Sequence, residues 1–313
     1  MHQNLNTTIC MITSKINSII YNLLIKTYWL RKSNILFKLW KKFWSISGKS
    51  KFLVKTKIHN FDAIVPPGHW YLLVLKNYKK YNNPLICILN YLENQLKRPL
   101  NIIDVGTAIG DMVLLFESKS RYKNNFICID GDEQFFQIAK NNLNFISDRV
   151  KIIYSLVSDN EEPIGKIIKE NPTTGTSKSS ELEIPKTIDN LVGDKTSIDF
   201  IKIDIDGYDG RAIGGITRIT NKFNPIIIFE WNVPLFIETK NDLYFPFIKL
   251  EELGYDSYYW FDNFGNFLFH TNLNTKSTLE KMAIYSINNA KTNGYHYDII
   301  AIKNDSGFIN FIQ

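Results

Sequence analysis

The chain has 313 residues, of which 44% are hydrophobic and 22% are charged. This composition supplies a full hydrophobic core and excludes a globally disordered chain, and the length suits one large domain or two modest ones. Its three cysteines (Cys10, Cys87 and Cys128) are too widely spaced for a disulfide framework or a cysteine metal site, so we expect a cytoplasmic protein.

The net charge of +6 is unevenly distributed along the chain. Residues 1–61 contain eleven Lys and Arg and no Asp or Glu, which leaves 26 basic and 31 acidic residues in the remainder. No run of about 18 apolar residues is uninterrupted, so a membrane-spanning helix is not predicted. No nucleic-acid recognition motif accompanies the basic residues, and nucleic acid is not expected as a partner.

The N-terminal segment, residues 15–45, has a helical pattern with basic residues between its apolar ones. The apolar residues that recur at helical spacing are Ile16, Ile19, Ile20, Leu23 and Leu24, and then Ile35, Leu36, Leu39, Trp40 and Phe43. Two interpretations are open: peripheral contact with an anionic membrane, or packing on the core with the lysines exposed. We therefore predict a basic amphipathic helical extension over 1–60, a helical lead-in over 61–98 and the main domain over 99–313.

Strands alternate with helices through the main domain, which predicts a mostly parallel sheet covered on both faces. We expect strands at 100–105, 126–130, 150–157, 198–204, 225–230, 255–261 and 297–302, and helices near 110–121, 132–146, 209–221, 240–253 and 277–291. The turn signal Asp262-Asn-Phe-Gly265, between aromatic runs, predicts an antiparallel hairpin. The polar stretch 159–185 is expected to be a long loop.

The segment from Asn101 to Asp111, NIIDVGTAIGD, combines an apolar run, an acid and two glycines. It predicts a buried strand, a tight turn and a helix N-terminus, where a ligand approaches the backbone closely. An acid before the turn suits a ligand with a positive charge or an amine, and S-adenosylmethionine carries both. The candidate cofactor-binding residues of this turn are Asp104, Gly106, Thr107 and Gly110.

Two further strand ends supply candidate cofactor contacts. Asp130 closes the apolar run that begins at Phe126, and a carboxylate at the end of a second strand can accept both ribose hydroxyls. The third strand ends at Leu156-Val-Ser-Asp159, where Ser158 is a candidate contact for the adenine amino group.

The fourth strand also ends in acids, Asp204 and Asp206, with Lys202 alternating onto the same face. Acids at this edge of a parallel sheet lie over the ligand crevice, and two close carboxylates raise one pKa or attract a divalent cation. We expect Asp204 to act as the catalytic base, with Asp206 as the second candidate. If a divalent metal ion takes part, Glu230 would join them as an oxygen ligand. The acids also suit the start of the following helix.

Together these motifs resemble the FkbM family of S-adenosylmethionine-dependent methyltransferases, over roughly residues 99–302. The resemblance rests on IDVGTAIG from Ile103 to Gly110, Asp130 followed by Asn141-Asn142-Leu143, Thr187-Ile-Asp189, KIDIDGYD from Lys202 to Asp209, and the run from Ile226 to Glu230. This sequence departs from the family pattern in Asp130-Gly131, where Glu-Pro is expected, and in Asp206 and Asp209, where Glu is usual.

The resemblance implies an α/β fold of the Rossmann-like class I methyltransferase type. Its sheet would have seven mostly parallel strands, one of them antiparallel, with helices on both faces. It also implies S-adenosylmethionine as cofactor and methyl transfer mostly to oxygen, often on sugars or glycolipids.

Three functional hypotheses follow. The first is O-methylation of a hydroxyl on a sugar, glycan or glycolipid, with the aromatic run from Tyr255 to Phe261 either stacking on a sugar or buried in the sheet. The second is a membrane-associated interaction protein with a catalytically inactive methyltransferase fold. A nicotinamide-dependent oxidoreductase is a distant third, because Ala108 stands where that turn needs glycine. His69, His270 and His296 are alternative bases that we expect to be surface or structural histidines.

Overall fold

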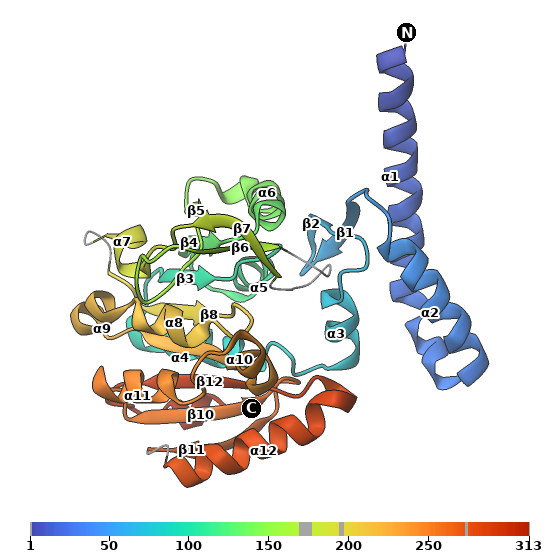
Figure 1. The fold of residues 1–313 in the computed structure, drawn as a ribbon. Coiled ribbons are helices and arrows are strands. Elements are labelled where there is room, and N and C mark those ends of the chain that lie inside the picture. The colour runs from blue at the N-terminus through green and yellow to red at the C-terminus, as the bar shows by residue number, and fades with distance from the viewer. Residues whose placement is uncertain (1, 169–176, 194–196, 273–274, 313) are drawn as a thin grey trace.

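An eight-stranded sheet runs through the centre of the molecule (Figure 1). The structure is a computed structural model that describes residues 2–168, 177–193, 197–272 and 275–312. The strand order is β11-β10-β12-β9-β8-β3-β4-β5. The strands are β3 (Asn101–Val105), β4 (Asn125–Asp130), β5 (Val150–Tyr154), β8 (Phe200–Ile203), β9 (Ile226–Trp231), β10 (Ser257–Asp262), β11 (Phe267–Thr271) and β12 (Tyr297–Ile302).

The five strands β5, β4, β3, β8 and β9 pair in parallel, and β12 then enters antiparallel between β9 and β10. The expected hairpin at residues 262–265 is confirmed, and its second strand, β11, pairs antiparallel with β10 at the edge of the sheet. The prediction of seven strands with one antiparallel was therefore wrong, because this hairpin extends the sheet by an eighth strand. The mostly parallel α/β architecture is confirmed.

Helices cover both faces of the sheet, as the alternating pattern predicts. The helices of the main domain are α4 (Asn83–Leu96), α5 (Asp111–Lys119), α6 (Glu133–Asn142), α7 (Ile188–Val192), α8 (Asp209–Gly214), α9 (Thr217–Phe223), α10 (Val233–Thr239), α11 (Phe245–Glu252) and α12 (Lys276–Asn293), with short 3-10 turns η2 (Asn144–Ile146) and η3 (Phe308–Phe311). Side chains alternate along each strand, so Ile102 of β3 packs with α4, α5 and α6. Its neighbour Ile103 packs with α8, α9, α11 and α12 on the opposite face.

Two stretches differ from the expected elements. The helix expected over 209–221 is divided into α8 and α9, which are separated at Gly215. The loop expected over 159–185 contains an antiparallel pair, β6 (Ile164–Ile168) and β7 (Ser177–Glu183), so that expectation was wrong for those segments. Residues 169–176 of the same stretch lie outside the described residues.

The N-terminal extension stands at one side of the sheet domain (Figure 1). It consists of α1 (His2–Thr27), η1 (Tyr28–Lys32), α2 (Asn34–Gly48), the antiparallel strands β1 (Val54–Ile58) and β2 (Phe61–Val65), and α3 (Tyr71–Asn77). The division predicted at residue 60 falls in the turn between β1 and β2. Within the described residues, no helix is both long enough and apolar enough to cross a membrane.

Candidate active site

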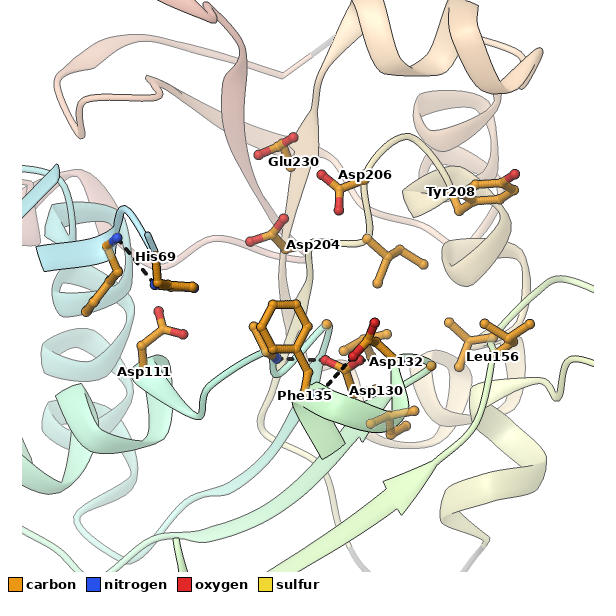
Figure 2. Close-up of a pocket in the computed structure, with 18 of the residues that line it drawn as sticks. His69, Asp111, Asp130, Asp132, Phe135, Leu156, Asp204, Asp206, Tyr208 and Glu230 are labelled. Carbon is orange, nitrogen blue, oxygen red and sulfur yellow. Dashed lines mark hydrogen bonds between the residues drawn. The ribbon is translucent and has the colours of Figure 1, made fainter. Parts of the chain in front are cut away.

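A cavity of about 390 Å³ opens at the carboxyl ends of β3, β4, β8 and β9, where parallel strands bring their terminal residues together. Six carboxylates line it: Asp111, Asp130, Asp132, Asp204, Asp206 and Glu230. Asp204, Asp206 and Glu230 gather on one side, and Asp130 and Asp132 lie across from them (Figure 2). Among the described residues that line this cavity there is no Lys or Arg. The cavity is therefore suited to a cationic ligand.

Gly106 lies on the cavity wall where the turn after β3 meets the end of β8. Its φ is +79°, and a β-carbon at this position would lie 1.9 Å from the carbonyl oxygen of Asp204. Only glycine fits this combination of positive φ and backbone contact. Gly110 has a similar φ of +81° but meets only the side chain of Leu143, and it does not line the cavity.

Asp104 does not line the cavity. The parallel pairing of β3 and β8 places it in register with Lys202. The ammonium of Lys202 is 3.4 Å from Asp104 Oδ1 and 3.2 Å from Asp204 Oδ2. Asp104 is 1% exposed, and its Oδ1 has no hydrogen-bond donor among the described groups. Burial raises the pKa of Asp104, and the charge on Lys202 partly offsets that rise. Burial lowers the pKa of Lys202, but Asp204, Asp104 and Asp111 outweigh burial, so its net shift is well upward.

Asp130 is held in place by two backbone groups. Its Oδ2 accepts from the amide of Ala108 at 2.7 Å and its Oδ1 from that of Asp132 at 2.8 Å. Burial raises the pKa of Asp130 to about 6, although these two hydrogen bonds act in the opposite direction. Asp132 caps α6 by accepting from Phe135 N at 2.8 Å. The Asp130 carboxylate therefore has a fixed orientation at the end of β4.

The remaining sequence candidates lie close to the cavity without lining it. Thr107 is buried, and its hydroxyl donates to the carbonyl of Asp104 at 2.9 Å. Ser158 is also buried, and its hydroxyl donates to Asp159 Oδ1 at 2.9 Å. The structure thus brings Gly106, Asp130, Asp204 and Asp206 together around the cavity, and it places Asp104, Thr107, Gly110 and Ser158 outside its lining.

Glu230 and His296 form a close pair at the cavity wall. His296 Nε2 lies 3.0 Å from Glu230 Oε2, and His296 Nδ1 is 2.9 Å from the carbonyl of Gly294. Burial, followed by the charge of Asp204, raises the pKa of Glu230 to about 8. Burial also raises the pKa of nearby Asp298 to about 7. A buried carboxyl with a raised pKa in contact with an imidazole is a candidate for acid–base chemistry.

Sequence reasoning missed the aromatic wall of this cavity, and it gave His69 and His296, which both line the cavity, only as disfavoured alternative bases. His69, Trp70 and Tyr71 enter it from the segment that leads into α3, and Tyr81 follows from the loop before α4. Asp111 also lines the cavity, and burial together with the neighbouring Asp104 charge raises its pKa to about 7. The signal for Asp111 was available as the acid directly after Gly110, whereas the aromatic wall depends on packing between distant segments.

No group of three or more His, Cys, Asp or Glu side chains in the described part of the chain is arranged to hold a metal ion. Asp204, Asp206 and Glu230, which the sequence offered as oxygen ligands, all line the cavity but do not form such a group.

A family model described as the methyltransferase FkbM domain matches residues 91–257, which is more than half of the chain. The chain belongs to the FkbM methyltransferase family. The family predicted from the sequence is thereby confirmed. A search of curated proteins found no match.

Several solved structures are similar to this FkbM chain at low identity. One is the methyltransferase FkbM from Methylobacillus flagellatus KT, with 18% identity, a TM-score of 0.34, and coverage of 52% of this chain and 50% of that one. A second is precorrin-6y C5,15-methyltransferase from Geobacter metallireducens GS-15, with 14% identity, a TM-score of 0.38 and coverage of 69% and 86%. The N-terminal domain of human METTL16 in complex with SAH has 12% identity, a TM-score of 0.38 and coverage of 75% and 80%.

Two of the FkbM motifs stabilise the fold and do not line the cavity. Asn142 bonds to both backbone groups of Ile64, at 2.8 and 2.9 Å, and to the carbonyl of Ile109 at 2.8 Å. Asp189 accepts from the amides of Arg218 at 2.7 Å and Ile219 at 3.0 Å, at the start of α9. These motifs therefore fasten β2 to α6 and α7 to α9.

Proposed function

We propose that this FkbM-family protein transfers a methyl group from S-adenosylmethionine to a hydroxyl oxygen of a sugar, glycan or glycolipid. One observation carries the donor assignment: among the described residues, six carboxylates and no Lys or Arg line a cavity at the strand ends. S-adenosylmethionine has a sulfonium and an α-amino group, and a carboxylate-lined cavity attracts both. Gly106 lines the same cavity, and a side chain there would displace the end of β8 and, with it, Asp204.

The residues present fit the parts of this cofactor. Asp130 has a fixed carboxylate with lone pairs left for ribose hydroxyls. Leu156 and Ile205 give the cavity apolar walls that suit an adenine ring.

The chemistry needs alignment, exclusion of water and removal of the acceptor proton. When bound, S-adenosylmethionine supplies a methyl group activated by its sulfonium. We assign the proton removal to Glu230 paired with His296, because a carboxyl with a pKa near 8 takes up a proton at working pH more readily than an ordinary carboxylate. Asp204, our base candidate from the sequence, is not assigned the proton removal, since it is already paired with Lys202 at 3.2 Å.

A neutral hydroxylated acceptor suits this cavity better than an anionic one, because the six carboxylates repel negative charge. The aromatic wall of Trp70, Tyr71 and Tyr81 offers surfaces for stacking on a sugar. Stacking by the run from Tyr255 to Phe261 is not part of this proposal. Those residues are at most 2% exposed where they are aromatic, and they pack inside the sheet.

Calorimetric titration with S-adenosylhomocysteine tests the donor site. Asp130→Asn is expected to weaken binding by at least tenfold, because a neutral amide is a poorer acceptor for ribose hydroxyls. Asp189→Asn is the matched control, since Asp189 also accepts two backbone N–H groups but lies outside the cavity. Equal weakening in both variants, or no binding by the unchanged protein, would refute the donor assignment.

The acceptor is tested by transfer of a labelled methyl group into a lysate fraction that contains glycans and glycolipids. We expect label in a base-stable ether on a carbohydrate, and Glu230→Gln should remove it. Label found in protein or nucleic acid would refute the acceptor class while leaving the donor site intact. Donor binding without transfer to any fraction would instead favour the inactive, membrane-associated alternative.

A further inference from the structure

The N-terminal helices carry large apolar side chains on an exposed face as well as on the face that packs on the protein. In α1, the face that packs on the protein combines the buried apolar residues Tyr21 and Leu24 with polar ones. Asn17 donates to the carbonyl of Phe52 at 2.9 Å, and the amide of Lys55 donates to Ser18 at 2.9 Å. The opposite face is apolar and exposed, and it consists of Ile16, Ile19, Ile20 and Leu23.

The second helix, α2, also presents an apolar stripe to the outside. Trp40 and Trp44 are buried on its inner face, whereas the residues at helical spacing on the next face are exposed. Ile35 is 75% exposed and Phe43 is 57% exposed. The full stripe is Ile35, Leu36, Leu39, Phe43 and Ile46, and Trp29 in η1 adds a ring that is 62% exposed. An ordinary soluble surface does not leave so many large apolar side chains in water on adjoining helices.

The charge around these stripes selects one kind of partner. Lys38, Lys41 and Lys42 are exposed beside the stripe of α2, and residues 1–61 contain eleven basic residues and no acidic one. We propose that α1, η1 and α2 form a docking surface for an anionic lipid bilayer. The apolar stripes enter the boundary between headgroups and acyl chains, and the lysines contact lipid phosphates.

A second copy of the chain is a poorer occupant for this docking surface. In a symmetric dimer both partners would contribute the same patch, with the same excess of positive charge. Residues 1–61 contain no carboxylate that could neutralise that charge. Like charges facing each other oppose association, whereas an anionic bilayer neutralises them.

The docking surface is connected directly to the cavity wall. The ring of Trp44 lies 5.1 Å from that of Trp70, and the hydroxyl of Tyr21 donates to the carbonyl of His69 at 2.7 Å. His69 and Trp70 both line the cavity. The inner faces of α1 and α2, the helices that would bind the bilayer, therefore contact the segment that forms this wall.

Vesicle sedimentation with the full chain tests this inference without any methyl donor, so its outcome is independent of the proposed function. Phosphatidylcholine vesicles with about one third phosphatidylglycerol should bind at least tenfold more tightly than pure phosphatidylcholine vesicles. Changing Lys38, Lys41 and Lys42 to Gln should weaken binding to the anionic vesicles by about a hundredfold, given the usual contribution of each basic residue at such a surface.

The apolar stripe is tested with a matched pair of double variants. Leu39→Glu with Phe43→Glu should abolish sedimentation with anionic vesicles. Ile284→Glu with Ile287→Glu changes the net charge equally on exposed α12 residues and should keep binding within about threefold of the unchanged protein. Unfolding temperatures close to that of the unchanged protein would show that all variants are folded.

Three outcomes would overturn the inference: absence of binding, equal binding to both vesicle types, or equal losses in the two double variants. A dimer in sedimentation equilibrium that Leu39→Glu with Phe43→Glu dissociates, without vesicle binding, would identify a second copy as the occupant instead.

Discussion

Replacing Gly106 by Ala is expected to damage the donor site more than any other single-methyl change in the turn after β3. The added carbon would lie 1.9 Å from the carbonyl oxygen of Asp204, far inside van der Waals contact. Because the clash is with backbone, rotation of a side chain cannot relieve it. The turn or the end of β8 must shift, and Asp204 would shift with it.

The magnitude of this effect follows from two contributions. A non-glycine residue at a φ of +79° costs about 1–2 kcal/mol, and overpacking in a closely packed region costs about 1–3 kcal/mol more. The sum, about 2–5 kcal/mol, leaves a domain of ordinary stability folded. We also expect affinity for S-adenosylhomocysteine to fall by more than tenfold.

Gly110→Ala is the matched control for Gly106→Ala. Its φ of +81° imposes the same conformational cost, but its β-carbon would meet only the side chain of Leu143, at 3.1 Å. We expect a destabilisation of about 1–2 kcal/mol with affinity unchanged within about threefold. Urea unfolding and calorimetric titration measure both effects. If Gly110→Ala weakens binding as much as Gly106→Ala does, the reasoning from close backbone approach is refuted.

Three further predictions concern charge. Binding of S-adenosylmethionine at pH 7 should release protons, because its cationic groups lower the raised pKa values of Asp111 (about 7) and Glu230 (about 8). Titration in buffers of different ionisation enthalpy measures this, and proton uptake would contradict it. In the unchanged enzyme kcat/KM should rise as pH increases through about 8, where Glu230 loses its proton. The variant Glu230→Gln should lack that rise, and its kcat should be lower by about 10²–10⁴. Glu117 is 12% exposed and accepts hydrogen bonds from Arg149 at 3.0 and 2.9 Å. Arg149→Met would leave this carboxylate without its partner, so the free energy of unfolding in urea should fall by about 3 kcal/mol. Adding Glu117→Gln should recover part of that loss, and a single variant as stable as the unchanged protein would show that the pair contributes nothing.

Local sequence was enough to predict the strand-end half of the site. Gly106, Asp130, Asp204 and Asp206 each end or follow an apolar run, and all four line the cavity. The reason is topological: parallel strands bring their carboxyl ends to one edge of the sheet, so a residue at a strand end needs no further information to be placed there.

The other half of the site was not predictable in this way. Trp70 and His296 lie 226 positions apart in the chain, and although His296 was named as an alternative base, no local pattern places either residue at the cavity. His296 enters because β12 inserts between β9 and β10 and brings it against Glu230. Such contacts depend on strand order, which a local pattern does not specify.

The amino-acid sequence by itself determined the alternation of strands and helices, the acids at the strand ends, the family and the basic N-terminal segment. The tertiary structure decided that Gly106 and not Gly110 faces the cavity, that the hairpin adds an eighth strand, and that the apolar stripes of α1 and α2 face outward. Helical periodicity shows that a helix has two unlike faces, but the surface against which the helix packs decides which face is buried. For α1 that surface includes the backbone of residues 52–55, whose polar groups pair with Asn17, Ser18 and Asn22. Tyr21 and Leu24 are buried on the same side, and the isoleucines are left in solvent.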